Sequence, residues 1–91
     1  MAQGRWFVYM LEAADGTLYT GITTDPERRF REHSSGGQRA AKYFKARTAR
    51  KIVYLEHQPD RSHASQREAA IKKLKRREKL ALIRQDKSVE C

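Results

Sequence analysis

The sequence predicts a mixed α/β (α+β) domain, a three-stranded antiparallel sheet flanked by helices. Three observations predict this class. Two strand-like runs are joined by a tight turn, a third run follows further along, and helical segments lie between and after the runs. The 91 residues suit one domain, expected at 1–84, followed by a flexible tail at 85–91. A chain this short buries a modest core, so two packed layers are expected.

The first two strands are predicted to form a hairpin. Residues 6–11 (WFVYML) are apolar without alternation, which is typical of a central strand covered on both faces. The Asp-Gly pair at 15–16 is a strong turn signal. Residues 17–23 (TLYTGIT) are rich in β-branched and aromatic types and predict the second strand. Residues 52–55 (IVYL), followed by a proline, predict the third.

Two helical regions are predicted around the third strand. Thr24 and Glu27 fit the S/T-x-x-E capping box, with a proline acceptably placed in the first turn, and this helix should end near His33. A longer helical stretch is expected at about 62–83, as one helix or as two with a break near Arg77.

The charge of the chain indicates a polyanionic partner. Twenty Lys and Arg residues against eleven Asp and Glu residues give a net charge of +9. Neutralised phosphates release counterions, so nucleic acid is the natural partner, although a merely soluble basic protein is the alternative. The basic run at 72–79 is either a solvated helix face or a further contact to a nucleic-acid backbone.

The only cysteine, Cys91, cannot form an internal disulfide, and this predicts a reducing, cytoplasmic (intracellular) location. No signal peptide is visible. The longest apolar run, 6–11, is far shorter than the ~20 residues that cross a bilayer, so no membrane association is expected.

Several residues are candidates for phosphate chemistry, each with a structural alternative. Tyr9 and Tyr19 are either ordinary sheet aromatics or phosphate contacts. Gly21 shares the strand face of Tyr19, and a glycine inside a strand often marks a close approach. Arg29 and His33 share a helix face, as a solvated pair or as groups that stabilise phosphoryl charge and move a proton.

Glu68 is the carboxylate of interest because it lies at the edge of the apolar stripe of the second helical region. A glutamate there should face the sheet, where an unpaired charge would be costly. A divalent metal ion or a nearby arginine would compensate it, and a salt bridge to a neighbouring base is as consistent with the pattern.

These residues, in this order, resemble the GIY-YIG nuclease family, and the resemblance covers residues 5–83. The first motif reads FVY at 7–9 and the second YTG at 19–21, followed by RRFREH at 28–33 and a helix containing QREA at 66–69. Phenylalanine replaces the first glycine of the family pattern, threonine replaces its isoleucine, and the downstream asparagine of several members is missing.

The resemblance implies a role for each matching residue. Tyr9 would activate the attacking water, Tyr19 would help to hold the water and the phosphate, and Arg29 would stabilise the transition state. His33 matches a histidine of many members, and either it or Tyr9 is the general base. Glu68 would be the sole protein ligand of a single Mg²⁺ or Mn²⁺ ion. Because a tyrosine has a reference pKa near 10, nearby positive charge is expected to lower it.

The function implied is that of a metal-dependent endonuclease hydrolysing DNA phosphodiester bonds, from the small single-domain bacterial branch. It would be structure-directed and linked to DNA repair or recombination, with RNA as an alternative substrate and no small-molecule cofactor. The alternative is a non-catalytic or weakly catalytic nucleic-acid-binding module of the same fold. Residues 38–49 are expected to form a short helix or ordered loop. The residues expected to bind substrate are Gly21, Arg28, Lys42, Tyr43, Lys45 and Arg47.

Overall fold

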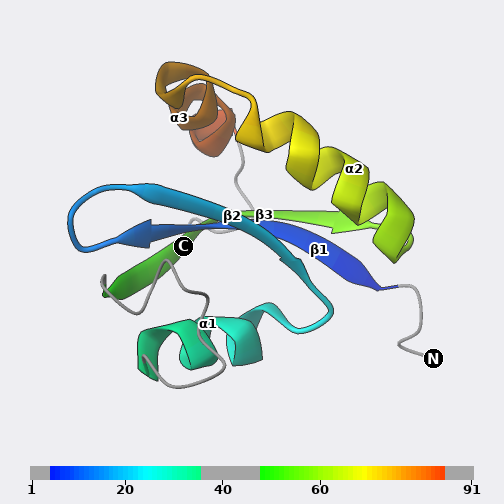
Figure 1. The fold of residues 1–91 in the computed structure, drawn as a ribbon, viewed down its shortest axis with the longest axis horizontal. Coiled ribbons are helices and arrows are strands. Elements are labelled where there is room, and N and C mark those ends of the chain that lie inside the picture. The colour runs from blue at the N-terminus through cyan, green and yellow to red at the C-terminus, as the bar shows by residue number, and fades with distance from the viewer. Residues whose placement is uncertain (1–4, 36–47, 86–91) are drawn as a thin grey trace.

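A computed structural model describes residues 5–35 and 48–85 of the chain (Figure 1). Its strands are β1 (Trp6–Ala13), β2 (Leu18–Thr23) and β3 (Ala49–Gln58), and its helices are α1 (Pro26–Ser35), α2 (Arg61–Lys72) and α3 (Arg76–Gln85). The strands form an antiparallel sheet in the order β2-β1-β3. The predicted fold class is confirmed. The expectation of two packed layers is wrong. The structure has three layers, because α1 covers one face of the sheet and α2 and α3 cover the other.

The central strand β1 explains the third layer. Val8, Tyr9, Met10 and Leu11 are each at most 2% exposed. Alternate side chains of a strand point to opposite faces, so an uninterrupted apolar run needs cover on both. Tyr9 and Leu11 pack in the core beneath α1, and Val8 and Met10 pack in a second core against α2.

The predicted turn joins β1 to β2. Gly16 has a φ of 86°, a conformation that side-chain-bearing residues rarely adopt. The Asp15 carboxylate accepts hydrogen bonds from the Thr17 backbone N–H at 3.1 Å and from its hydroxyl at 2.7 Å. This local network fixes the hairpin, in which Tyr9 pairs directly with Gly21.

Strand β3 begins earlier than its apolar run predicts. It starts at Ala49 and includes Arg50 and Lys51, so the expectation of helix or loop is wrong at residue 49. Residue 48 belongs to no helix or strand, and 38–47 lie outside the described residues. Pairing with β1 holds these polar residues in the strand, through two register shifts typical of β-bulges.

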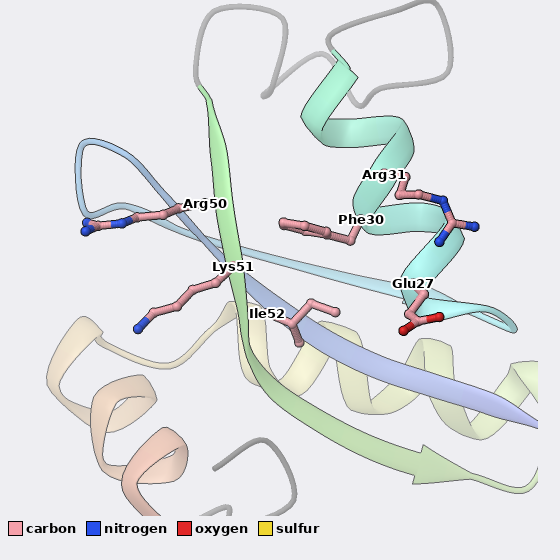
Figure 2. Close-up of a pocket in the computed structure, with 6 residues that line it drawn as sticks. All are labelled: Glu27, Phe30, Arg31, Arg50, Lys51 and Ile52. Carbon is pink, nitrogen blue, oxygen red and sulfur yellow. The ribbon is translucent and has the colours of Figure 1, made fainter. Parts of the chain in front are cut away.

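Helix α1 begins at Pro26, one residue later than expected if Thr24 were the N-cap. The Asp25 carboxylate accepts a hydrogen bond from the Arg28 backbone N–H at 3.2 Å, and the Asp25 N–H donates to the Thr23 hydroxyl at 3.1 Å. Asp25 is therefore the N-cap, and the predicted Thr24–Glu27 capping box is wrong. Phe30 extends from α1 towards β3, near Ile52 (Figure 2).

The second helical region is two helices, α2 and α3, with the break at 73–75 rather than near Arg77. Asp60 caps α2 by accepting a hydrogen bond from the His63 N–H at 2.8 Å. The Glu78 carboxylate accepts from the Lys75 N–H at 2.8 Å and so starts α3 at Arg76. Among the described residues, no helix combines the length and apolar character needed to cross a membrane.

Candidate active site

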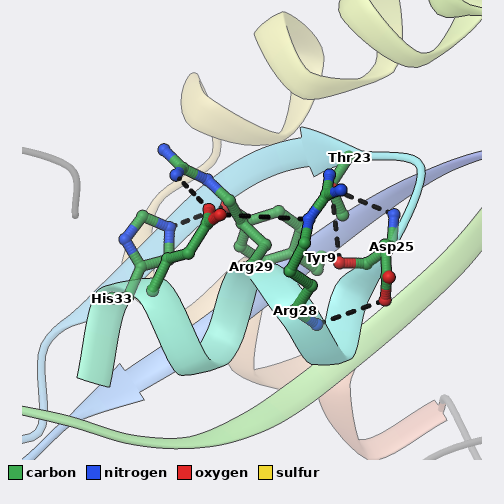
Figure 3. A network of polar contacts seen from close by, with 7 residues as sticks. Tyr9, Thr23, Asp25, Arg28, Arg29 and His33 are labelled. Atoms are coloured by element: carbon green, nitrogen blue, oxygen red, sulfur yellow. Dashed lines mark hydrogen bonds and ion pairs between the residues drawn. The ribbon is translucent and has the colours of Figure 1, made fainter. Parts of the chain in front are cut away.

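Two buried residues, Tyr9 of β1 and His33 of α1, form the centre of the site. They are 2% and 1% exposed, and the Tyr9 hydroxyl lies 3.1 Å from His33 Nε2 (Figure 3). Burial, and then the positive charge of Arg29, lower the pKa of His33 to about 4. The imidazole is therefore neutral at pH 7, and in the tautomer that carries its proton on Nδ1, Nε2 accepts a hydrogen bond from the phenol.

The pKa of Tyr9 is raised above its ordinary value, and the largest cause is burial of the phenol. Neighbouring Tyr19 also raises it, whereas the charge and hydrogen bonding of Arg29 lower it. Nearby positive charge was expected to lower the pKa of Tyr9. Arg29 does act in that direction, but the expectation is wrong for the net shift, which is upward. Tyr9 in the resting protein is accordingly a neutral phenol, hydrogen-bonded to His33.

Gly21 provides the space that the Tyr9 phenol occupies. A Cβ atom on Gly21 would lie 2.5 Å from the Tyr9 hydroxyl and 3.2 Å from Cε2 of Tyr19. The close approach that this glycine indicates is therefore made by two phenols of the chain itself. A direct contact between Gly21 and substrate stays a prediction.

Tyr19 completes an aromatic cluster with Tyr9 and His33. Its ring meets the His33 ring edge-on, with centroids 5.4 Å apart, and lies 6.3 Å from the Tyr9 ring. Tyr19 is half-buried, whereas Tyr9 and His33 are almost fully enclosed. Of the two phenols, Tyr19 is therefore the more accessible to a substrate.

Arg29 connects this cluster to the surface of α1. Its Nη1 atom lies 2.8 Å from Glu32 Oε1, and its guanidinium hydrogen-bonds with the Tyr9 phenol. Arg28, which is expected to bind substrate, is more exposed and forms a long contact of 3.9 Å with the same Glu32. Glu32 thus orients Arg29 at the edge of the buried pair.

Glu68 approaches from α2, on the opposite face of the sheet from α1. Its side chain is 23% exposed, and Oε2 lies 3.2 Å from Lys72 Nζ, so the salt-bridge alternative is present in the structure. Its negative charge also contributes to the raised pKa of Tyr9. Tyr9, Tyr19, Arg29 and His33 are thus joined by direct interactions, whereas Glu68 acts on Tyr9 through its charge.

The donor set for a metal ion is small. Within residues 5–35 and 48–85, no group of three or more His, Cys, Asp or Glu side chains could hold an ion. A single half-buried carboxylate still fits Mg²⁺, which keeps several waters and commonly binds one or two carboxylates together with substrate phosphates. Glu68 fits that role, and a closed metal cage is absent from the described part of the chain.

A groove of about 350 Å³ between α1 and β3 was not predicted from the sequence. Its lining residues are Glu27, Phe30, Arg31, Arg50, Lys51 and Ile52. The basic residues before Ile52 were the available signal, but their placement depends on β3 beginning at Ala49. The other expected substrate contacts, Lys42, Tyr43, Lys45 and Arg47, lie outside the described residues.

Comparison with known families identifies the class that this fold and cluster define. The family model of the GIY-YIG catalytic domain matches residues 5–81, and the chain belongs to the GIY-YIG family. This domain implies nuclease activity in general, and hence a nucleic-acid substrate.

Within that family, the chain is similar to UPF0213 proteins. It is 49% identical over 79 residues to a UPF0213 protein of Desulfotalea psychrophila, covering 87% of this chain and 71% of the relative. It is 50% identical over 80 residues to a UPF0213 protein of Syntrophus aciditrophicus, covering 88% and 91%. The solution NMR structure of a UPF0213 protein from Bacillus halodurans superposes with a TM-score of 0.58 at 36% identity, covering 93% and 88%.

Proposed function

We propose that this protein is a metal-dependent endonuclease that hydrolyses DNA phosphodiester bonds. The observation that carries the proposal is the Tyr9–His33 hydrogen bond, with Arg29 and Glu68 both acting on the same phenol. Groups from β1, α1 and α2 thus influence one oxygen atom, although they are far apart in sequence. Ordinary packing of a strand tyrosine does not require a neutral buried imidazole as its hydrogen-bond acceptor.

The proposed proton transfer runs along this hydrogen bond, with the His33 proton on Nδ1 and Nε2 free to accept. The Tyr9 O–H proton moves to His33 Nε2, and the phenolate oxygen takes a proton from the attacking water. The net result is a hydroxide nucleophile, a neutral Tyr9 and a protonated His33. The negative charge of Glu32 favours the protonated imidazole, whereas burial and the charge of Arg29 outweigh it and leave the pKa of His33 lowered, so His33 holds this proton only transiently. A phenolate with a raised pKa is a strong base once formed, which favours the second transfer.

The remaining residues of the cluster act on the phosphate. Arg29 stabilises the charge that develops on the phosphoryl oxygens, and Glu32 fixes its orientation. Tyr19, the more accessible phenol, orients the phosphate and the water. Glu68 would hold Mg²⁺ or Mn²⁺, which when bound supplies positive charge at the phosphoryl and leaving oxygens.

The net charge of +9 favours contacts to the phosphate backbone over base reading. The proposed substrate is therefore a DNA structure such as a branch, a flap or a damaged site, in repair or recombination within the cytoplasm. RNA is the alternative substrate. The Glu68–Lys72 ion pair favours a second candidate, a binding module with little cleavage activity, because it occupies the proposed metal ligand.

The test measures cleavage and binding side by side on labelled branched, flapped, nicked and single-stranded DNAs with Mg²⁺ or Mn²⁺. Glu68→Gln should abolish cleavage and leave binding unchanged or slightly tighter, because it removes negative charge near the phosphate. Glu12→Gln, a carboxylate on β1 outside the site, is the matched control and should cleave normally. Full cleavage by Glu68→Gln rejects the metal role. Cleavage absent from the unmodified protein on every substrate supports the binding module.

A further inference from the structure

A polar network centred on Glu56 of β3 lies on the sheet face that α2 covers. The Glu56 carboxylate accepts hydrogen bonds from the Tyr54 hydroxyl and from the Gln58 side-chain amide, both on the same strand. The Nε–H of Arg67, on α2, donates to both carboxylate oxygens at 3.1 Å. Alternate residues of a strand share a face, and Tyr54 packs with Ile71 of α2 in the second core. The Arg67–Glu56 pair therefore links α2 to β3.

Helix α2 rests on the sheet along a narrow line of buried residues. Its two buried residues are Ala64 and Ile71. They are seven positions apart, close to two full turns of a helix, so they lie one behind the other along its axis. A helix held along one line can roll about that line. A contact at the side of the line is therefore needed to fix its rotation.

Arg67 and Glu68 lie on opposite sides of this buried line. Consecutive helical residues are about 100° apart, so these two positions fall about 50° to either side of it. Arg67 reaches across to β3 through Glu56. Glu68 forms its ion pair with Lys72 of the same helix, and a contact within one helix cannot fix how that helix is rotated on the sheet. The contact on the Arg67 side therefore controls where Glu68 points.

We propose that Glu56 and Arg67 are positioning residues that set the rotation of α2 and so direct the Glu68 carboxylate towards the Tyr9 hydroxyl. This assignment rests on the proposed function in one respect, because it takes Glu68 to be the metal ligand. Side chains of a helix end about 5–6 Å from its axis, so a roll of about 10° moves the carboxylate by about 1 Å. A displacement of about 1 Å at a catalytic centre can cost about a hundredfold in rate.

Opposite charge changes separate positioning from a direct electrostatic effect. Glu56→Met and Arg67→Met each break the pair and keep an unbranched side chain. Glu56→Met removes a negative charge and Arg67→Met a positive one, so direct effects on a bound cation would have opposite signs. Displacement of Glu68 has the same sign in both. Each variant should raise the Mn²⁺ concentration for half-maximal cleavage of a labelled flapped DNA by about tenfold. The double variant should add nothing further, because either change alone breaks the pair.

The rotation of α2 is measured by NMR without metal or substrate. Residual dipolar couplings of backbone N–H bonds vary along a helix with its 3.6-residue period, and the phase of this variation reports the rotation of the helix relative to the sheet. In EDTA, the phase should shift by about 10° or more in both single variants. Asp60→Ala is the control, because it removes the N-cap of α2 and lowers stability but leaves the Arg67–Glu56 pair intact. It should change neither the phase nor the Mn²⁺ requirement.

An unchanged phase in both single variants overturns the proposal, and so do Mn²⁺ requirements that move in opposite directions. A phase shift without any change in the Mn²⁺ requirement of an active enzyme overturns the link to Glu68. If Glu56→Met does not fold, Arg67→Met decides alone, since its side chain is 37% exposed. The phase requires neither metal nor cleavage. A phase shift in a protein that never cleaves therefore rejects the proposed function and keeps the assignment of Glu56 and Arg67.

Discussion

The hydroxyl of Tyr9 occupies the space that a side chain on Gly21 would need. The two residues are direct partners across β1 and β2, and a Cβ on Gly21 would lie 2.5 Å from the phenol oxygen. The same oxygen is hydrogen-bonded to His33 on the far side. The absence of a side chain at Gly21 therefore allows Tyr9 to reach the imidazole.

Gly21→Ala should displace the Tyr9 phenol and break its hydrogen bond to His33. We expect cleavage to fall by at least about tenfold, and overpacking to cost about 1–3 kcal/mol of stability, measured by urea unfolding. Gly16→Ala is the control, because it strains a turn with φ of 86° and should lower stability without affecting cleavage by folded protein. Normal cleavage by Gly21→Ala would show that the Tyr9 position is not needed for activity.

The buried neutral His33 should make stability depend on pH. Its pKa is lowered from 6.5 to about 4 in the folded protein, so below about pH 6.5 the unfolded chain binds a proton that the folded chain does not. The free energy of unfolding should therefore fall as the pH drops from about 6.5 to about 4, and be unaffected by His33 above that window. Between about pH 7.5 and about pH 5 the loss is about 2 kcal/mol.

Urea unfolding of His33→Gln at both pH values measures this contribution, which the variant should lack. His57→Gln, on the exposed side of β3, is the matched control and should keep the pH dependence of the unmodified protein. Identical pH profiles for His33→Gln and the unmodified protein would contradict the prediction.

Thr20→Val should stabilise the protein. Thr20 is 3% exposed, and its hydroxyl has no hydrogen-bond partner among the described residues. Replacing that hydroxyl with a methyl group of similar shape removes a desolvation cost, so a gain of about 1 kcal/mol is expected in urea unfolding. Thr17→Val should instead destabilise, because the Thr17 hydroxyl donates to Asp15. A loss of stability in Thr20→Val would indicate a partner for this hydroxyl.

Lys72→Met should lower the metal concentration needed for cleavage. The Lys72 ammonium lies 3.2 Å from Glu68 Oε2 and competes with a divalent ion for that carboxylate. Because exposed ion pairs contribute at most about 1 kcal/mol, half-saturating Mn²⁺ should fall about two- to fivefold. Lys73→Met removes the same charge without this ion pair and is the control. If both variants lowered the half-saturating Mn²⁺ concentration equally, the effect would come from the lower net positive charge and not from the Glu68–Lys72 ion pair.

Local patterns were sufficient for the hairpin and for the relative placement of Tyr9, Arg29 and His33, whereas the roles of these residues were implied by the family resemblance. The apolar run of β1 and the Asp15–Gly16 turn determine strand pairing, which places Tyr9 opposite Gly21. The four-residue spacing of Arg29 and His33 places both on the side of α1 that meets this strand. These relations depend on neighbours in sequence or on direct strand partners.

Properties that arise from packing between elements were not predictable in the same way. The raised pKa of Tyr9 depends on burial beneath α1, which outweighs the charge of Arg29. The α2–α3 break follows from a hydrogen bond between Glu78 and the Lys75 backbone, and Lys75 is not a typical cap residue. The groove requires polar residues to be held in β3 by pairing with β1.

Strand β1 supplies alternate side chains to both cores. An insertion or deletion in this strand would therefore disturb the reaction centre and the fold at the same time. A one-residue slip of this strand would exchange Tyr9 with Met10, placing a thioether beside His33 and a phenol in the apolar core against α2. Such a change would remove activity and folding together. Point substitutions on the helices, by contrast, can change the site while the sheet keeps its register. Inactive relatives of this protein should therefore differ by point substitutions, with the length of β1 preserved.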